Sequence, residues 1–324
     1  MDKLRVGVIG VGHMGNYHAR IYHQLQKYVD FVGVCDIRKS RANEIAALYG
    51  TKPFYHFRDL LPHVDAVNIA VPTSEHYKVA KGCLEAGVHI LLEKPMTRIY
   101  EDAVELIDIA EKQNLSFHVG HVERFNAAVL ELTDVIKGQT PVFLEAKRQG
   151  PPGERERTSG VILDLMIHDI DIILGLVKSG VAGIAAVGKK VYSKFEDIAN
   201  VQIYFENGSF ATISASRVSQ TKIRTLSITM PDYDIFLDYA SEDISIHRKA
   251  TTSDNVVDGK MKQVQDSYVE RLTVNRDNPL RLEVEHFLNC IQDHEKPIYS
   301  AMDNLRSLKI ALKALEITER NLRG

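Results

Sequence analysis

Short apolar runs alternate with longer amphipathic segments through the first 120 residues. The runs are rich in β-branched residues and nearly continuous, which is typical of strands buried on both faces of a parallel sheet. They cover Leu4–Ile9, Phe31–Cys35, Ala66–Ala70, Val88–Leu92 and Leu115–Val119. The segments between them predict helices over Asn16–Lys27, Ser40–Leu48, Ser74–Glu85 and Glu101–Gln113. This alternation predicts a doubly wound α/β domain over residues 1–120.

The pattern changes to a period of two after residue 120. Alternating runs cover Pro141–Lys147, Val201–Phe205, Ser209–Ser214, Leu226–Met230 and Asp234–Leu237. Asn207-Gly208 separates two of them, which is a strong hairpin signal. We therefore expect an α+β domain with a largely antiparallel open sheet over residues 121–324. Residues 250–265 are polar and aperiodic, so we expect a surface loop there. Helices are predicted over Pro279–Gln292 and Ala301–Asn321, and the C-terminal helix is expected to pack back on the first domain.

Composition narrows the function classes. Hydrophobic residues make up 44% and charged residues 26%, as in an ordinary globular protein. The net charge of −3 is small and Lys and Arg are scattered, so we expect no nucleic-acid partner. The charged start does not resemble a signal peptide, and no apolar stretch approaches the roughly 20 residues that span a bilayer, so we expect no membrane partner. The widely spaced Cys35, Cys83 and Cys290 are typical of reduced thiols, and we expect a cytoplasmic protein.

Glycines follow the first predicted strand at the spacing of a dinucleotide-binding loop. Gly10, Gly12 and Gly15 form G-x-G-x-x-G and enclose His13 and Met14. Such a loop between a strand and a helix lets the backbone approach a pyrophosphate at the helix N-terminus. The alternative, glycines that only turn the chain, is disfavoured by an acid at the end of the next strand. We therefore expect a Rossmann domain.

That acid is Asp36, about 20 residues after Gly15, where a carboxylate accepts hydrogen bonds from the adenosine ribose and repels a 2′-phosphate. NAD is therefore the expected cofactor. NADP stays open, because the guanidinium of Arg38, after Ile37, could meet a 2′-phosphate or stack on adenine.

Two further strand ends should approach the cofactor, since ligands in such sheets lie beyond the carboxyl ends of the strands. The expected contacts are Ala70, Val71, Pro72, Thr73, His76, Glu93 and Lys94. His76 taken alone is better explained as a surface residue at a helix start than as a catalyst. Lys94 precedes Pro95, which restricts its backbone and allows a cis bond, so its side chain could be aimed. A solvated lysine at a strand end is the alternative.

The segment 161–174 is apolar except for a few polar positions. Asp164, His168 and Asp171 recur at i, i+4 and i+7 and predict a polar stripe on a mostly buried helix. A carboxylate one turn before a histidine can orient the ring, which leaves the other nitrogen free to exchange a proton with substrate. Interdomain packing through salt bridges is an alternative. A metal site is the least favoured interpretation, because no other ligands cluster nearby, and we predict no metal.

These residues suggest a mechanism. His168 removes the proton of a substrate hydroxyl, and hydride passes from the carbinol carbon to the nicotinamide. Lys94 stabilises the developing alkoxide by a hydrogen bond, and Asp164 positions His168. We therefore expect an NAD(P)-dependent oxidoreductase that acts on CH–OH groups.

The order of these motifs resembles the glucose–fructose oxidoreductase/inositol dehydrogenase/MocA family. The matching stretches are Gly10–Gly15, Pro72–His76, Glu93–Pro95, Gly120–Asn126 and Asp164–His168. The resemblance implies catalytic roles for Lys94, Asp164 and His168. It also implies a homo-dimer or homo-tetramer formed through the open face of the second sheet.

Two stretches, around Gly120–Asn126 and Asp164–Asp171, resemble a branch that includes UDP-N-acetylglucosamine 3-dehydrogenases. Met166 stands where many family members have glycine, so a simple polyol pocket is not implied. The expected substrate is a sugar or sugar nucleotide, bound by residues that include His168. Basic and amide side chains that could serve a phosphorylated substrate are Arg124, Asn126, Arg148, Arg155 and Arg157, although a solvated basic loop is the better explanation of the last three.

Three other functions remain open from the sequence. They are an inositol or free-sugar dehydrogenase of the same family, a non-catalytic dinucleotide-binding sensor, and a reductase of a carbon–carbon double bond or an imine.

Overall fold

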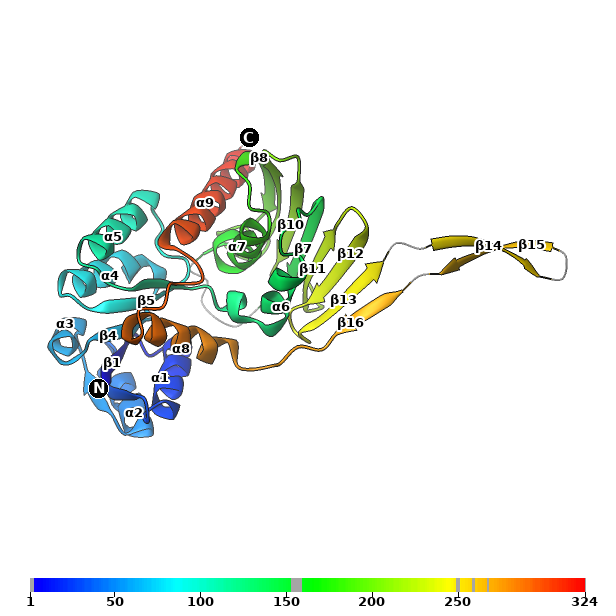
Figure 1. Cartoon of the computed structure of the whole chain (residues 1–324). Helices are drawn as coiled ribbons and strands as arrows, with labels where there is room; N and C mark the ends of the chain where they lie inside the picture. The colour runs from blue at the N-terminus through cyan, green and yellow to red at the C-terminus, as the bar shows by residue number, and fades with distance from the viewer. Residues whose placement is uncertain (1–2, 153–158, 249–250, 258–259, 267, 324) are drawn as a thin grey trace. The chain divides into compact units, whose positions relative to one another are not determined.

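The computed structural model describes residues 3–152, 159–248, 251–257, 260–266 and 268–323 (Figure 1). The chain forms two compact units. The first comprises residues 1–125 and 278–312, and the second comprises residues 126–277 and 313–324. The last helix, α9 (Ala301–Arg323), begins in the first unit and ends in the second.

A six-stranded parallel sheet organises the first unit, as the apolar runs predicted. The strand order is β3-β2-β1-β4-β5-β6, so it reverses between β1 and β4. The strands are β1 (Leu4–Ile9), β2 (Val29–Cys35), β3 (Lys52–Phe54), β4 (Ala66–Ile69), β5 (His89–Glu93) and β6 (Phe117–Gly120). The pattern missed β3, because it is a short edge strand with little buried surface. Ligands of such sheets bind at the carboxyl ends of the strands beside the reversal.

Helices cover both faces of this sheet and build two apolar cores (Figure 1). One core joins the sheet to α1 (His13–Gln24), α2 (Lys39–Tyr49) and α8 (Pro279–Gln292). The other joins it to α3 (Phe57–Leu60), α4 (His76–Glu85), α5 (Tyr100–Lys112) and the start of α9. Short 3₁₀ turns lie at η1 (Leu61–His63), η2 (Thr73–Glu75) and η3 (Val122–Phe125). Each large apolar side chain buried here, such as Phe287, stabilises the fold by about 1.5–3 kcal/mol.

An eight-stranded sheet organises the second unit, in the order β16-β13-β12-β11-β7-β10-β9-β8. Its pairs are antiparallel except β7 with β10, so the prediction of a largely antiparallel sheet is confirmed. The strands are β7 (Phe143–Gln149), β8 (Val181–Lys189), β9 (Ile198–Phe205), β10 (Phe210–Ser216), β11 (Ile223–Thr229), β12 (Tyr233–Asp238), β13 (Asp243–Arg248) and β16 (Val269–Leu272). The β9–β10 hairpin turns at Asn207-Gly208 as predicted, with Gly208 at φ 87°.

One face of this second sheet is buried and the other is open. Along β9, Val201, Ile203 and Phe205 are buried, while Gln202 and Tyr204 between them are exposed. The π-helical turn η4 (Ile162–Met166) and helix α7 (Ile167–Leu176) contact β10, and α6 (Ala127–Val135) contacts β13.

The prediction of a surface loop over residues 250–265 is wrong. Strands β14 (Thr251–Val257) and β15 (Lys260–Asp266) pair there as a separate antiparallel sheet. These residues show no strand pattern in the sequence, because a two-stranded ribbon outside the main sheet needs no apolar face of period two.

No helix within the described ranges is both long and apolar enough to cross a bilayer. All three cysteines are free thiols and buried.

Candidate active site

The glycine loop after β1 has no room for a side chain at two of its glycines and has open space at the third. Gly10 has φ +84°, and a Cβ there would lie 2.8 Å from the Ala70 carbonyl group. A Cβ on Gly15 would lie 1.8 Å from the carbonyl oxygen of Gly10, so only glycine fits. A Cβ on Gly12 would meet nothing within 4 Å. The loop therefore leaves open space beside Gly12 at the N-terminus of α1, which suits a pyrophosphate.

Asp36 fastens this loop to the end of β2. Its Oδ2 accepts the Val11 N–H at 3.2 Å, and its Oδ1 accepts the Arg38 N–H at 2.9 Å. Asp36 is only 8% exposed. Each carboxylate oxygen has more than one lone pair, so the group can still accept bonds from ribose hydroxyls. These residues fit a bound NAD, which supplies the hydride acceptor when present.

The residues that follow Asp36 in the sequence are much more exposed to solvent. Ile37 is 87% exposed, and the Arg38 side chain is 66% exposed with its Nε 3.4 Å from Asp36 Oδ1. The exposed His13 and half-buried Met14 complete the predicted loop contacts. Contact of these four side chains with the cofactor stays a prediction.

Arg41 is a cofactor-loop residue that the sequence analysis missed. From the first turn of α2, its Nε donates to the Val11 carbonyl oxygen at 2.7 Å, and its Nη2 lies 3.4 Å from that of Gly12. The guanidinium therefore anchors the backbone of the glycine loop from α2. Its signal was a basic helix start a few residues after the predicted ribose-binding acid.

Replacing Asp36 with serine should move cofactor preference toward NADP. The carboxylate repels a 2′-phosphate, and charges a few ångströms apart at a partly exposed site interact by about 1–3 kcal/mol. The ratio of kcat/KM for NADP over NAD should therefore rise about tenfold to a hundredfold. Asp30→Ser, at the opposite end of β2, is the control and should leave the ratio unchanged. An unchanged ratio in Asp36→Ser would contradict the role of Asp36.

His76 joins the ends of β4 and β5. Its Nδ1 lies 2.9 Å from the Pro95 carbonyl oxygen and its Nε2 lies 3.0 Å from that of Val71. The ring is 1% exposed, so the interpretation of His76 as a surface residue at a helix start is wrong. Burial lowers the pKa of His76, although the two carbonyls favour the charged ring. The residue brings the predicted Ala70–Thr73 and Glu93–Lys94 segments together.

Lys94 lies directly after β5, at the same edge of the sheet as the glycine loop. It is half-buried, and the Lys94–Pro95 peptide is cis. The preceding Glu93 is bonded to His18 of α1, a residue that the sequence analysis did not single out. The first unit thus gathers the glycine loop, Asp36 and Lys94 at the carboxyl ends of β1, β2 and β5.

The second unit carries Asp164 and His168. The predicted helix over 161–174 forms as a π-helical turn, η4, followed by α7. The three residues of the predicted polar stripe differ in burial: Asp164 is exposed, His168 is half-buried and Asp171 is only 3% exposed. Inserted π-turns of this kind are frequent at functional sites.

Two buried acids fasten this π-turn and helix to the second sheet. The Glu196 carboxylate accepts the Ile162 N–H at 3.1 Å, and burial raises the pKa of Glu196. Arg148 of β7 donates from Nε and Nη2 to the two carboxylate oxygens of Asp169, at 2.8 and 3.0 Å. Because Asp169 follows His168 directly, this pair fixes the helix beside the predicted base.

The predicted substrate-binding residues have structural contacts. The Arg124 guanidinium lies 4.0 Å from the centre of the Tyr299 ring. Asn126 caps α6 by accepting the Ala128 N–H at 3.0 Å, and it donates to the Tyr239 carbonyl oxygen at 3.1 Å. Arg148 is buried in a strand, so the solvated-loop interpretation is wrong for it. Arg155 and Arg157 lie outside the described residues. Substrate binding by Arg124, Asn126 and Arg148 stays a prediction.

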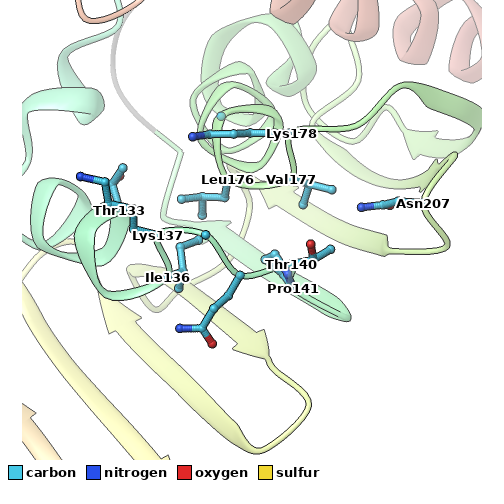
Figure 2. A pocket seen from close by; sticks show the side chains of 12 residues that line it. Thr133, Ile136, Lys137, Thr140, Pro141, Leu176, Val177, Lys178 and Asn207 are labelled. Carbon is cyan, nitrogen blue, oxygen red and sulfur yellow. The ribbon is translucent and has the colours of Figure 1, made fainter.

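Two surface hollows, one in each unit, contain none of the predicted site residues, whereas a third, in the first unit, is lined by residues that include Arg124, Tyr299 and Glu283. Figure 2 shows a hollow of about 250 Å³ in the second unit, where Thr133 and Lys137 face the segment Leu176–Lys178. Another, in the first unit, is lined by residues that include Arg5, Asp30 and Asp65 near the amino ends of the strands. Neither hollow brings together groups for acid–base chemistry. Among the described residues, no cluster of three or more His, Cys, Asp or Glu side chains is arranged to hold a metal ion.

The fold and the cofactor loop define the class: this is an NAD-binding oxidoreductase of the Rossmann type. Residues 4–121 match the family described as "Oxidoreductase family, NAD-binding Rossmann fold", and residues 136–231 match the "GFO/IDH/MocA C-terminal domain". The chain belongs to the GFO/IDH/MocA family, as its motifs suggested.

Relatives and solved structures agree with this assignment. The chain is 34% identical over 317 residues to UDP-N-acetylglucosamine 3-dehydrogenase of Acidithiobacillus ferrooxidans, covering 98% of this chain and 97% of the relative. The solved structure of that protein, GnnA, matches with a TM-score of 0.90 at 33% identity, covering 99% and 100% of the two chains. Scyllo-inositol 2-dehydrogenase (NAD(+)) of Bacillus subtilis is 25% identical over 96% of this chain and 93% of its own.

Proposed function

We propose that this chain is an NAD-dependent dehydrogenase that oxidises the 3-hydroxyl of UDP-N-acetylglucosamine. The observation that carries the proposal is the 34% identity to a UDP-N-acetylglucosamine 3-dehydrogenase, which extends over 98% of the chain. The oxidoreductase class itself rests on the family and on the cofactor loop, whereas the substrate and the roles of individual residues belong to the proposal.

The proposed chemistry needs a base and a group that stabilises negative charge. His168 removes the proton of the sugar hydroxyl, and Asp164 orients its ring. Lys94 donates a hydrogen bond to the oxygen that becomes an alkoxide. The buried Arg148–Asp169 pair beside His168 supports a fixed position for the base.

Substrate turnover with labelled sugars tests this proposal. UDP-N-acetylglucosamine, N-acetylglucosamine, myo-inositol and scyllo-inositol are each incubated with NAD or NADP, and reduction of the cofactor is followed by absorbance. UDP-N-acetylglucosamine deuterated at C3 should give a deuterated reduced cofactor and a slower rate, and the C4-deuterated sugar should give neither. Turnover of only the polyols would overturn the nucleotide-sugar assignment.

An inositol dehydrogenase is the second candidate. The similarity to scyllo-inositol 2-dehydrogenase over 96% of this chain favours it, at a lower identity of 25%. The same panel separates the two, because this candidate requires turnover of an inositol and none of the nucleotide sugar.

We also propose a cytoplasmic homo-oligomer formed through the open face of the second sheet. Aromatic side chains gather on that face: Tyr204 and Phe210 are paired across β9 and β10, and the Phe143 ring of β7 lies 4.7 Å from that of Phe210. Tyr204 and Phe210 are 44% and 42% exposed. Exposed apolar patches of this kind mark interaction sites. Light scattering of the purified protein measures the oligomeric state.

A further inference from the structure

A chain of hydrogen bonds runs through the core of the first unit and ends beside Lys94. The Tyr22 hydroxyl donates to Asn68 Oδ1 at 2.6 Å, and the Asn68 amide nitrogen lies 2.7 Å from His18 Nδ1. His18 Nε2 lies 2.9 Å from Glu93 Oε1. Tyr22 and Asn68 are 0% exposed and His18 is 1% exposed. Polar groups are costly to bury among apolar side chains unless every partner is satisfied, so this connected set needs an explanation.

The chemistry of each group fixes the direction of donation along this series of hydrogen bonds. Burial raises the pKa of Tyr22, so its hydroxyl keeps its proton and donates it to the Asn68 oxygen. The Asn68 amide then donates to His18 Nδ1, which therefore acts as an acceptor and carries no proton. In the neutral ring the proton lies on Nε2 and points at the carboxylate of Glu93. All three bonds thus run in one direction and end on a carboxylate, which cannot donate in return.

Titratable groups face Glu93 from several elements. Burial acts to raise the pKa of Glu93, but the hydrogen bond from His18 and the nearby His18, Lys94 and His76 together lower it. From α8, burial and the charge of Glu93 raise the pKa of Glu283 well above its ordinary value. The surroundings therefore shift the pKa values of the two carboxyl groups in opposite directions, which favours the ionised form of Glu93 and the protonated form of Glu283.

We propose that His18 is a positioning residue, which fixes Glu93 as an oriented carboxylate and through it aligns Lys94 for catalysis. Asn68 and Tyr22 set the tautomer of His18 and so complete the chain. Glu93 precedes Lys94 directly, so a fixed carboxylate restrains both the backbone at Lys94 and the field around its ammonium. The proposal rests on the proposed function only through the role of Lys94.

Two substitutions of His18 separate positioning from mere packing. In His18→Gln the terminal amide nitrogen can still donate near the position of Nε2. In His18→Asn the shorter amide can pair with Asn68 but does not reach Glu93. Both side chains are polar and no larger than histidine, so they form a matched pair. Glu283→Gln is the control, because it replaces a neutral buried carboxyl beside Glu93 with a neutral amide.

Kinetics give the first readout. His18→Asn should lower kcat about tenfold to a hundredfold through misplacement of Lys94, with little change in KM for NAD. The pKa of Glu93 should be higher in His18→Asn than in the parent protein, because the ionised carboxylate loses a hydrogen bond. The acid limb of the pH profile of kcat should therefore move toward neutral pH. His18→Gln and Glu283→Gln should stay close to the parent protein. Equal effects of His18→Asn and His18→Gln, or no effect of either, would overturn the proposal.

Nuclear magnetic resonance gives a second readout that needs no turnover. In protein with ¹⁵N-labelled histidine, His18, assigned through its loss in His18→Gln, should be the neutral Nε2–H tautomer. A carboxyl titration of ¹³C-labelled glutamate should place the pKa of Glu93 below its ordinary value in the parent and higher in His18→Asn. An Nδ1–H or charged His18 at neutral pH, or an unchanged Glu93 pKa, would refute the proposal. If no sugar is turned over while these signals hold, the proposed function fails and the hydrogen-bond chain stands.

Discussion

Lys94→Met is expected to lower kcat by about a hundredfold to a thousandfold, the usual loss when a donor to a developing oxyanion is removed. Methionine keeps the length and much of the bulk of the side chain but offers no hydrogen bond and no charge. The glycine loop and Asp36 do not depend on Lys94, so the dissociation constant for NADH should change little. Initial rates and fluorescence titration of NADH binding measure the two quantities.

A control lysine separates this effect from a general loss of charge. Lys78 is exposed on α4 in the same unit, and Lys78→Met should leave kcat and NADH binding unchanged. A Lys94→Met protein that keeps more than about a tenth of the parent kcat, well short of the loss expected for such a donor, would remove Lys94 from the chemistry.

Asp169→Leu is expected to lower the free energy of unfolding by about 3–5 kcal/mol, because it leaves the buried guanidinium of Arg148 without its carboxylate. The side chains of Arg148 and Asp169 are 4% and 0% exposed, so water cannot replace the lost partner. Urea unfolding followed by circular dichroism measures the change. Since Asp169 neighbours His168, kcat should also fall.

The double variant Arg148→Met/Asp169→Leu tests the cause. Removing both charges leaves no unpaired ion in the core, and such replacements are often close to neutral in stability. The double variant should therefore be more stable than Asp169→Leu alone. A double variant that is less stable, by the sum of the two single losses, would show that the pair is not coupled.

Local signals in the sequence were enough for most of the fold. Continuous β-branched runs predicted the parallel sheet, and α8 forms over the predicted Pro279–Gln292, because burial on two faces or on one helical stripe leaves a clear period. The residues of the β14–β15 ribbon show no such period in the sequence. The short edge strand β3 was lost for the same reason: neither has a continuous apolar face.

The cofactor site was also largely predictable, since it is built from consecutive residues. Gly10 and Gly15 are required by backbone geometry, and Gly12 lies beside open space, as the spacing of a dinucleotide-binding loop indicated. Arg41 was missed because its function depends on how the first turn of α2 approaches the loop. His76 was misjudged, because nothing in its neighbours shows that it pairs with Pro95, which lies 19 positions further on, just after the end of the next strand.

By itself, the sequence determined the order of strands and helices, the dinucleotide loop with its acid, and the family to which the chain belongs. The tertiary structure decided which polar residues are buried and with whom they pair: Arg148 with Asp169, Asn126 as a helix cap, and His18 with Asn68 and Glu93. The reason is physical. Periodicity records which side of an element meets the core, whereas a hydrogen bond between residues 75 positions apart exists only after the strands have assembled.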